Sequence, residues 1–129
     1  MYGNNELSKI VLKCESLYTT RIEFVYSNSQ TFGFCYNCSL TTYVRNFTLN
    51  MLNKDVYSFA HSSGGIIDLL EICVKDSTTL AITCMKGCDT SRTLTNKYNN
   101  ITNVISFVGS FDKLYNSLAK FGVRYVLIN

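Results

Sequence analysis

Short segments in which hydrophobic and polar residues alternate recur along this sequence. The alternation has the two-residue period of a strand that buries one face and exposes the other. Clusters of Asn, Ser, Thr and Gly separate the segments, as is typical of turns. The alternating segments are 9–15, 21–26, 31–36, 68–74, 80–84 and 123–127. Strands this short at this spacing predict an all-β fold, either a sandwich, a barrel or a prism.

Two regions lack this alternation. The first runs from residue 86 to about residue 103 and is the longest predicted loop. In the second, which spans residues 113–121, Leu114, Leu118 and Phe121 have the spacing of one face of a helix. We interpret this second region as a loop that leads into the last strand.

The sequence also contains an internal repeat. Residues 56–62 and 104–110 share Val, Ser, Phe and Ser at the same four positions. Residues 10–16 form a weaker copy, so the copies recur roughly every 50 residues. A second apolar strand follows each copy, which indicates three supersecondary units that bury their apolar faces together. We therefore expect a β-prism of three four-stranded sheets with an internal pseudo-three-fold repeat.

The composition fits one small domain that spans residues 1–129. A chain of 129 residues, of which 47% are hydrophobic, can bury one ordinary core. Its nine Tyr and eight Phe favour pleated, half-buried surfaces. The net charge of +3 comes from scattered Lys and Arg residues, which argues against a nucleic-acid partner. No apolar run approaches the roughly 18 residues that span a bilayer, so we expect no membrane span.

Six cysteines leave the redox state and the compartment open. In an exported protein they could form three disulfides in any of several pairings. The first six residues are polar and lack the apolar core of a signal peptide, so we expect either a cytosolic chain or a domain of a longer secreted or surface protein. Cys14 and Cys73 alternate with apolar residues and are expected to be buried. The remaining cysteines are Cys35, Cys38, Cys84 and Cys88, whose spacings suit zinc. The pairs Cys35/Cys38 and Cys84/Cys88 each fall at a strand end, and we expect no metal and no other cofactor.

Three stretches of the chain resemble the jacalin-like lectins. Residues 9–28 resemble the opening hairpin of that family, and residues 105–110 and 121–125 are similar to its closing segments. Residues 62–72, SSGGIIDLLEI, resemble its central hairpin and contain a Gly-x-x-x-Asp loop. Together with the repeat, this resemblance covers nearly the whole chain. It implies a β-prism of three Greek-key sheets with sugar bound at loops clustered on one end.

The resemblance implies that the Gly-x-x-x-Asp loop binds sugar. A carboxylate accepts hydrogen bonds from adjacent hydroxyls, backbone N–H groups donate to the same oxygens, and glycine lets the backbone approach closely. Asp68 is then the main acceptor, with the N–H groups of Ile66 and Ile67 as donors. In the third repeat the acidic residue, Asp112, lies one position early, and Asn116 is its substitute. The expected carbohydrate-binding residues are Ser63, Gly64, Gly65, Ile66, Ile67, Asp68, Asp112 and Asn116.

We therefore expect a carbohydrate-binding module that is not an enzyme. The sequence has no Gly-x-Ser-x-Gly motif, phosphate loop or paired-carboxylate arrangement, and its single histidine, His61, lies beside a predicted loop. The expected partner is a carbohydrate or the glycan of a glycoprotein, and self-association into a homo-oligomer is left open. The alternative is a protein-interaction or structural β-prism that has lost sugar binding, which the altered third repeat favours.

Overall fold

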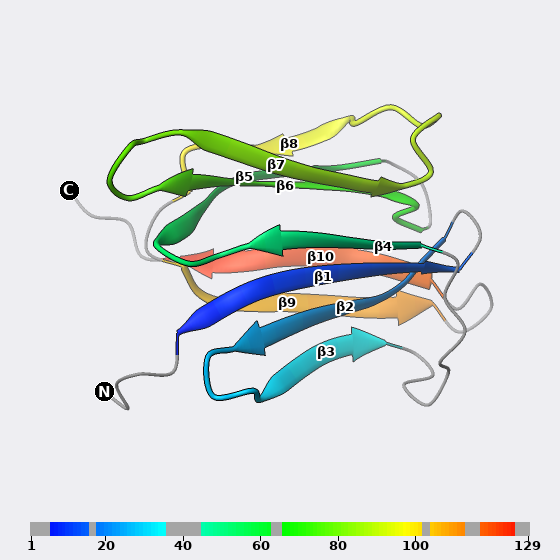
Figure 1. The fold of residues 1–129 in the computed structure, drawn as a ribbon. Coiled ribbons are helices and arrows are strands. Elements are labelled where there is room, and N and C mark those ends of the chain that lie inside the picture. Colours follow the sequence, from blue (N-terminus) through cyan, green and yellow to red (C-terminus); the bar gives the residue numbers. More distant parts are fainter. Residues whose placement is uncertain are drawn as a thin grey trace.

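The computed structural model describes residues 6–15, 18–35, 45–62, 66–101, 104–112 and 117–125. These residues form strands and turns (Figure 1) and include no helix, hence none long and apolar enough to cross a membrane. In chain order the strands are β1 (Leu7–Glu15), β2 (Tyr18–Tyr26), β3 (Thr31–Cys35), β4 (Arg45–Asn50), β5 (Lys54–His61), β6 (Leu69–Asp76), β7 (Ile82–Cys88), β8 (Asn96–Tyr98), β9 (Val104–Asp112) and β10 (Ser117–Tyr125).

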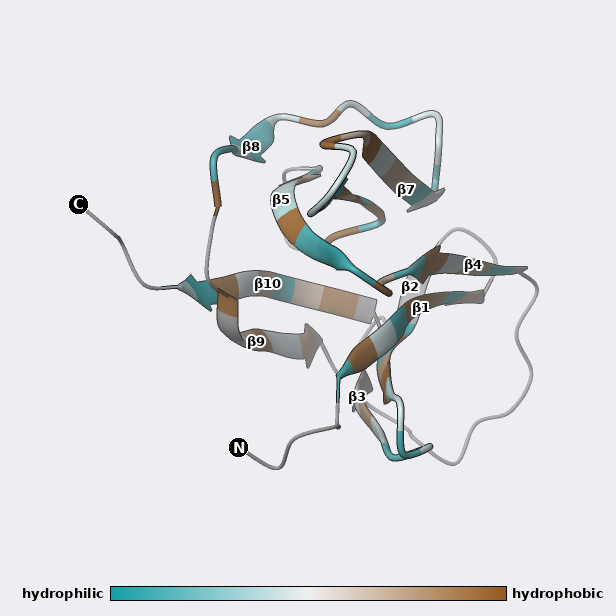
Figure 2. Cartoon of the chain, turned by 60° about the vertical axis from the view of Figure 1, so that its left-hand side comes forward, coloured by the Kyte–Doolittle hydropathy of each residue, from teal (hydrophilic) through white to brown (hydrophobic). Residues whose placement is uncertain are grey.

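The strands pair only antiparallel and form three sheets within the described residues. Two sheets have four strands, in the orders β3-β2-β1-β4 and β7-β6-β5-β8, and β9 and β10 form a two-stranded sheet. Figure 2 shows the sheets facing a common interior. One cluster of buried side chains has members from all three sheets, among them Leu12 on β1, Ile72 on β6 and Leu118 on β10. The predicted all-β class is therefore confirmed.

The predicted alternation explains which side chains enter this core. On β1, Ile10, Leu12 and Cys14 are each 0% exposed, and on β6, Leu70 and Ile72 are at most 1% exposed. Each such aliphatic side chain contributes about 1.5–3 kcal/mol when it is removed from water. The alternating pattern therefore fixes the inward face of these strands.

The three copies of the sequence repeat each lie on the first strand of a hairpin. Residues 10–15 lie on β1, residues 56–61 on β5 and residues 104–110 on β9. Each of these strands is the first strand of an antiparallel hairpin, whose second strand is β2, β6 or β10. Each hairpin thus begins with a copy of the repeated segment.

The strand prediction was incomplete at two places in the described residues. β4 was not predicted, although Phe47 and Leu49 alternate there with polar residues. The predicted loop from residue 86 to about residue 103 is wrong in two respects, because β7 continues to Cys88 and the short strand β8 pairs with β5 inside that segment. Tyr36, expected at the end of the third strand, lies outside the described residues.

The helix-like spacing near the end of the chain has a different origin. Residues 117–125 form β10, so this strand begins well before the predicted start at residue 123. A register shift between Leu118 and Lys120 interrupts the pairing of β10 with β9. A bulge of this kind moves the following residues to the other face of the strand. Leu118 and Phe121 are therefore both buried, although they lie three residues apart.

Two disulfides join described cysteines. Cys14 on β1 is bonded to Cys88 on β7, which ties the first sheet to the β5–β8 sheet. Cys73 on β6 is bonded to Cys84 on the neighbouring strand β7. Cys14 and Cys73 are buried as expected, but as half-cystines. Cys84 and Cys88 belong to different disulfides, so they do not act together as the zinc-ligand pair that their spacing suited.

The contact between these two sheets also depends on a glycine. A Cβ atom on Gly87 of β7 would lie 2.5 Å from the ring of Phe47 on β4. That separation is far below van der Waals contact, so only glycine lets the ring lie against the backbone of β7.

The strands give the molecule two distinct ends. β1, β5 and β9 run in the same direction in Figure 1, so their last residues lie together with the first residues of β2, β6 and β10, at the end we call the hairpin end. The N–H of Ile67, before β6, donates to the carbonyl oxygen of Leu118 on β10, which places two of these hairpins side by side there. The first residues of β1, β5 and β9 lie at the opposite end.

Candidate functional site

Of the sugar-binding residues expected from sequence, the structure describes Ile66, Ile67, Asp68 and the backbone of Asp112. Ser63, Gly64, Gly65 and Asn116 lie outside the described residues, and Asp112 is the last residue of β9, whose side chain is likewise not described. Of the flanking residues that the structure describes, Ile67 before β6 donates its N–H to the carbonyl oxygen of Leu118 on β10. The expected grouping of the two loops at one end stays a prediction.

Asp68 is buried and fully engaged with its own protein. Its residue is 7% exposed, and the Ser62 hydroxyl donates a hydrogen bond of 2.7 Å to its Oδ1. Arg92 Nη1 lies 3.3 Å from its Oδ2. The Asp68 carbonyl oxygen also accepts the N–H groups of Cys88 and Asp89. Asp68 thus joins the end of β5, the start of β6 and the segment after β7.

The expected backbone donors are accounted for only in part. Ile67 N–H was predicted to donate to a sugar oxygen. In this structure it donates to the Leu118 carbonyl oxygen, so it is not available to a sugar. Ile66 is partly exposed. His61 does not pair with the Ser62 hydroxyl, because its Nδ1 lies 2.7 Å from the Ser62 carbonyl oxygen and the Ser62 hydroxyl donates to Asp68.

A pocket of about 680 Å³ opens at the other end of the molecule. It lies among the first residues of β1, β5 and β9, the end of β2, the start of β3 and the turn after β6. All three sheets therefore contribute to its wall. The lining residues are Glu6, Leu7, Phe24, Tyr26, Phe32, Met51, Asn53, Lys54, Asp55, Val56, Ser77, Val104, Ser106 and Phe107.

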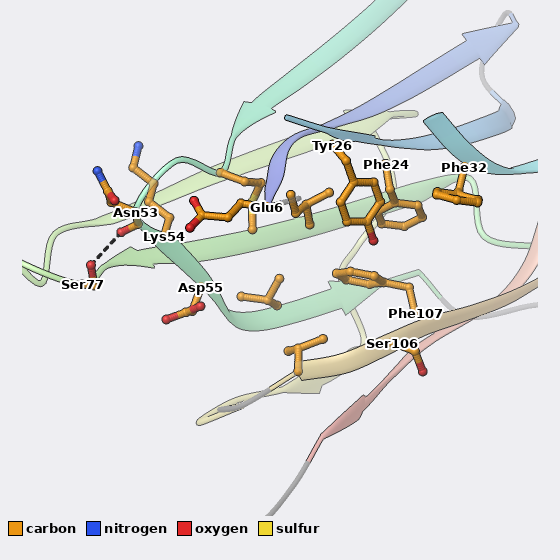
Figure 3. Close-up of a pocket in the computed structure, with 14 residues that line it drawn as sticks. Glu6, Phe24, Tyr26, Phe32, Asn53, Lys54, Asp55, Ser77, Ser106 and Phe107 are labelled. Carbon is orange, nitrogen blue, oxygen red and sulfur yellow. Dashed lines mark hydrogen bonds between the residues drawn. The ribbon is translucent and has the colours of Figure 1, made fainter. Parts of the chain in front are cut away.

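One wall of the pocket is aromatic. Phe24 stacks on Phe107 with their ring centroids 4.4 Å apart, and Tyr26 meets Phe32 edge to face at 5.7 Å. The rings lead from the core to the surface, since Phe24 is 3% exposed and Phe32 is 59% exposed. Figure 3 shows these four rings gathered on one side of the pocket. A stacked cluster with one open ring offers a flat apolar surface to a ligand.

The opposite wall is polar. In Figure 3, Glu6, Asn53, Lys54 and Asp55 gather there, with Ser77 hydrogen-bonded to the carbonyl oxygen of Asn53 at 3.1 Å. Glu6, Asn53 and Asp55 are exposed. Among the described residues, no hydrogen bond or ion pair engages the carboxylate of Glu6 or of Asp55. These two groups therefore differ from Asp68, whose two carboxylate oxygens both have protein partners.

A further ionised carboxylate borders this polar wall. Asp76, beside Ser77, accepts the N–H groups of Thr79 and Thr78 at 2.9 and 2.8 Å. These hydrogen bonds hold the pKa of the Asp76 carboxyl below its usual value. Asp76 shapes the turn between β6 and β7, and the carboxylates of the pocket wall remain free to accept hydroxyl groups.

Sequence reasoning did not find this pocket. Its residues come from separate segments of the chain that only the folded sheets bring together. The available signal was the alternation of residues 31–36, which placed Phe32 on the apolar face of a predicted strand. β3 is the edge strand of its sheet, and Phe32 remains open to solvent for that reason.

Comparison with known proteins gives a likeness in fold. No family model matches the chain, and no curated protein matches it. A solved structure, described as the crystal structure of PirB, superimposes with a TM-score of 0.69 and 14% sequence identity. The match covers 100% of this chain and 31% of that chain. At this identity the likeness concerns the fold, and the present chain corresponds to about a third of the PirB chain.

Proposed function

We propose that the chain is a β-prism domain that binds carbohydrate and is not an enzyme. Three observations support the prism: the three sheets around one core, the three hairpins, and the position of a repeat copy on the first strand of each hairpin. We place the carbohydrate contacts in the pocket formed by Phe32, Tyr26, Glu6 and Asp55, at the end opposite the Gly-x-x-x-Asp loop.

The observation that carries this proposal is the pairing of an open aromatic wall with unengaged carboxylates. A sugar ring has an apolar face of C–H groups, which packs on an aromatic ring. It also has a rim of hydroxyl groups, and one carboxylate can accept hydrogen bonds from two neighbouring hydroxyls. Phe32 and Tyr26 supply the ring surface, and Glu6 and Asp55 supply the acceptors across the pocket. Lys54 adds a donor for the same hydroxyl oxygens.

Asp68 has a structural role in this proposal. A sugar hydroxyl would compete with Ser62 and Arg92 for a buried carboxylate, and a buried donor such as the Ser62 hydroxyl costs about 1–3 kcal/mol when it is left without its partner. The pocket carboxylates bind a hydroxyl without such a loss. The resemblance to lectins thus bears on the fold and the class of ligand, and the contacts follow from the pocket.

A protein-interaction domain is the second candidate. Leu52 and Leu80 are 51% and 63% exposed on two turns that a Ser77–Asn53 hydrogen bond holds together beside the pocket, and Ile82, the first residue of β7, is 52% exposed. Exposed aliphatic residues in one place favour a protein surface as partner. This candidate predicts binding that depends on these three residues and is indifferent to free sugar.

The test is a glycan array probed with the labelled wild-type chain and with Phe32→Ala and Asp55→Asn. Each substitution is expected to weaken binding by about tenfold, which corresponds to about 1.4 kcal/mol. Tyr98→Ala and Glu71→Gln serve as controls, because they remove an exposed aromatic ring and a carboxylate outside the pocket. Binding to no glycan contradicts carbohydrate recognition. Glycan binding that survives both pocket substitutions contradicts the location.

A further inference from the structure

The two disulfides of the described residues differ in their access to solvent. Cys14 and Cys88 are both 0% exposed and lie between two sheets. Cys73 is 6% exposed, but its partner Cys84 is exposed on β7, the edge strand of its sheet. Thiol–disulfide exchange requires a thiolate to reach one sulfur of the bond. A reductant in solution therefore reaches the Cys73–Cys84 bond in the folded chain, whereas Cys14–Cys88 is enclosed.

A carboxylate lies beside the exposed disulfide. Glu71 is two residues before Cys73 on β6, so both side chains point to the same face, and Cys84 lies directly opposite Cys73 on β7. A carboxylate oxygen of Glu71 and the two sulfurs all lie within 4.8 Å of one another. Lys86 is paired with Glu71 across the strands, on the same face, and is exposed. A positive charge beside a thiol favours its thiolate form.

We propose that Cys73, Cys84 and Glu71 form a redox-gated site for a thiophilic divalent cation of the Zn²⁺ class. A small dithiol transfers two electrons and two protons to the disulfide, which gives two protein thiols and the cyclic disulfide of the reductant. Zn²⁺ then displaces one proton from each thiol and binds the two thiolates and the Glu71 carboxylate. Water fills the fourth position, as in zinc sites that have three protein ligands.

The sheet keeps the ligands together after the disulfide opens. β6 and β7 pair from Leu69 opposite Cys88 to Lys75 opposite Ile82, so Cys73 and Cys84 lie in the middle of a continuous ladder. The buried Cys14–Cys88 bond independently anchors the end of β7 to β1. Reduction therefore frees two adjacent thiols without separating the strands that hold them, and the cation binds a preformed arrangement.

The test begins with the full oxidised chain. Brief treatment with dithiothreitol, removal of the reagent under argon, alkylation and mass spectrometry are expected to show Cys73 and Cys84 modified and Cys14 and Cys88 still bonded. Calorimetric titration of the unalkylated, reduced chain with Zn²⁺ is expected to show one equivalent bound. The oxidised chain in the same titration is expected to bind none at this site.

Two variants separate the ligands. Glu71→Gln keeps the disulfide and is expected to weaken Zn²⁺ binding by at least about tenfold, because it removes one of three protein ligands. Cys84→Ser is expected to abolish the binding. Simultaneous reduction of both disulfides would overturn the proposal, and so would selective reduction without stoichiometric Zn²⁺ binding or unchanged affinity in Glu71→Gln. The site lies outside the aromatic pocket, so these outcomes do not depend on carbohydrate binding.

Discussion

At the scale of single residues, burial decides what each carboxylate can do. Asp68 is held by the Ser62 hydroxyl and by Arg92, whereas Asp55 is exposed and accepts nothing from the described residues. A carboxylate whose oxygens are occupied stabilises a loop, and one that faces water can exchange water for a sugar hydroxyl. An aspartate thus serves as a structural tie at one end of the molecule, and another aspartate has the binding role that we propose at the other end.

Asp68→Ala tests the structural tie. It is expected to lower the free energy of unfolding by about 2 kcal/mol, because the Ser62 hydroxyl loses its acceptor and Ser62 is only 1% exposed. Arg92→Ala is the control and is expected to lower the free energy of unfolding by less than about 1 kcal/mol, since the Arg92 side chain is 44% exposed. Urea unfolding measures both. A variant Asp68→Ala as stable as wild type contradicts this role.

Asp76 makes part of the stability depend on pH. Its folded pKa is lowered by the N–H groups of Thr79 and Thr78. A lowered folded pKa adds stability above the unfolded pKa of about 3.9, and this contribution is lost as the pH falls through the folded value. Asp76→Asn keeps an acceptor oxygen without the titration. Between pH 7 and pH 3, wild type is therefore expected to lose more stability than the variant in urea unfolding, and parallel losses contradict this assignment.

Sequence alone anticipated these residues unevenly. It selected Asp68 from the Gly-x-x-x-Asp spacing, but spacing carries no information on whether Ser62 and Arg92 occupy the carboxylate. Arg92 is far from Asp68 in the sequence and belongs to a segment that was predicted as loop. The pocket residues Glu6 and Asp55 have no motif in common, since they face the same space only after β1 and β5 are placed in different sheets.

At the scale of elements, alternation predicted strands well where the predicted segment itself contains no bulge. It located β1, β2 and β6, whose inward residues alternate without interruption through Ile10, Leu12 and Cys14 or Leu70, Ile72 and Val74. It misjudged β10 because the bulge after Leu118 changes the face of the strand and imitates a helical spacing. Bulges depend on the partner strand, so the sequence of one strand does not reveal them.

The turn between β6 and β7 contains a residue that local geometry disfavours. Leu80 has a φ of 63° and is 63% exposed. The left-handed region costs a residue with a Cβ about 1–2 kcal/mol, but asparagine tolerates it better. Asn53 and Asn100 already adopt it in this chain, each with a φ of 58°.

Leu80→Asn is therefore expected to raise the free energy of unfolding by about 0.5–1 kcal/mol. Leu52→Asn is the matched control, since Leu52 is similarly exposed on the neighbouring turn but does not have a positive φ. Chemical denaturation of the two variants beside wild type measures the difference. Equal changes in both would show that the backbone of Leu80 is not strained.

At the scale of the whole molecule, the two disulfides join cysteines at different separations in the sequence. Cys14–Cys88 spans 74 residues and joins two sheets, and Cys73–Cys84 spans 11 residues within one sheet. The positions of the six cysteines in the sequence did not predict the disulfide pairing, because the pairing depends on which strands become neighbours in the fold. The repeat, by contrast, was visible in the sequence and falls on the first strand of each hairpin.

Removal of the two bonds is expected to have unequal effects. In the loop-entropy model, the Cys14–Cys88 bond contributes roughly 4.5 kcal/mol and the Cys73–Cys84 bond roughly 3 kcal/mol. The double variant Cys14→Ala with Cys88→Ala should therefore unfold at a lower urea concentration than Cys73→Ala with Cys84→Ala. A larger loss from the second pair would contradict the role of Cys14–Cys88 as the main covalent tie between sheets.

Carbohydrate recognition at the aromatic pocket is tested most directly by an NMR titration of the ¹⁵N-labelled chain with a glycan selected on the array. The expected result is that the shifted backbone amides gather around Glu6, Phe32, Asn53–Asp55 and Ser106, with a saturable dependence on glycan concentration, and that Phe32→Ala needs about ten times more glycan for the same shifts. The contrary result is a set of shifts confined to residues 66–68 and the hairpin end, or no shift with any glycan.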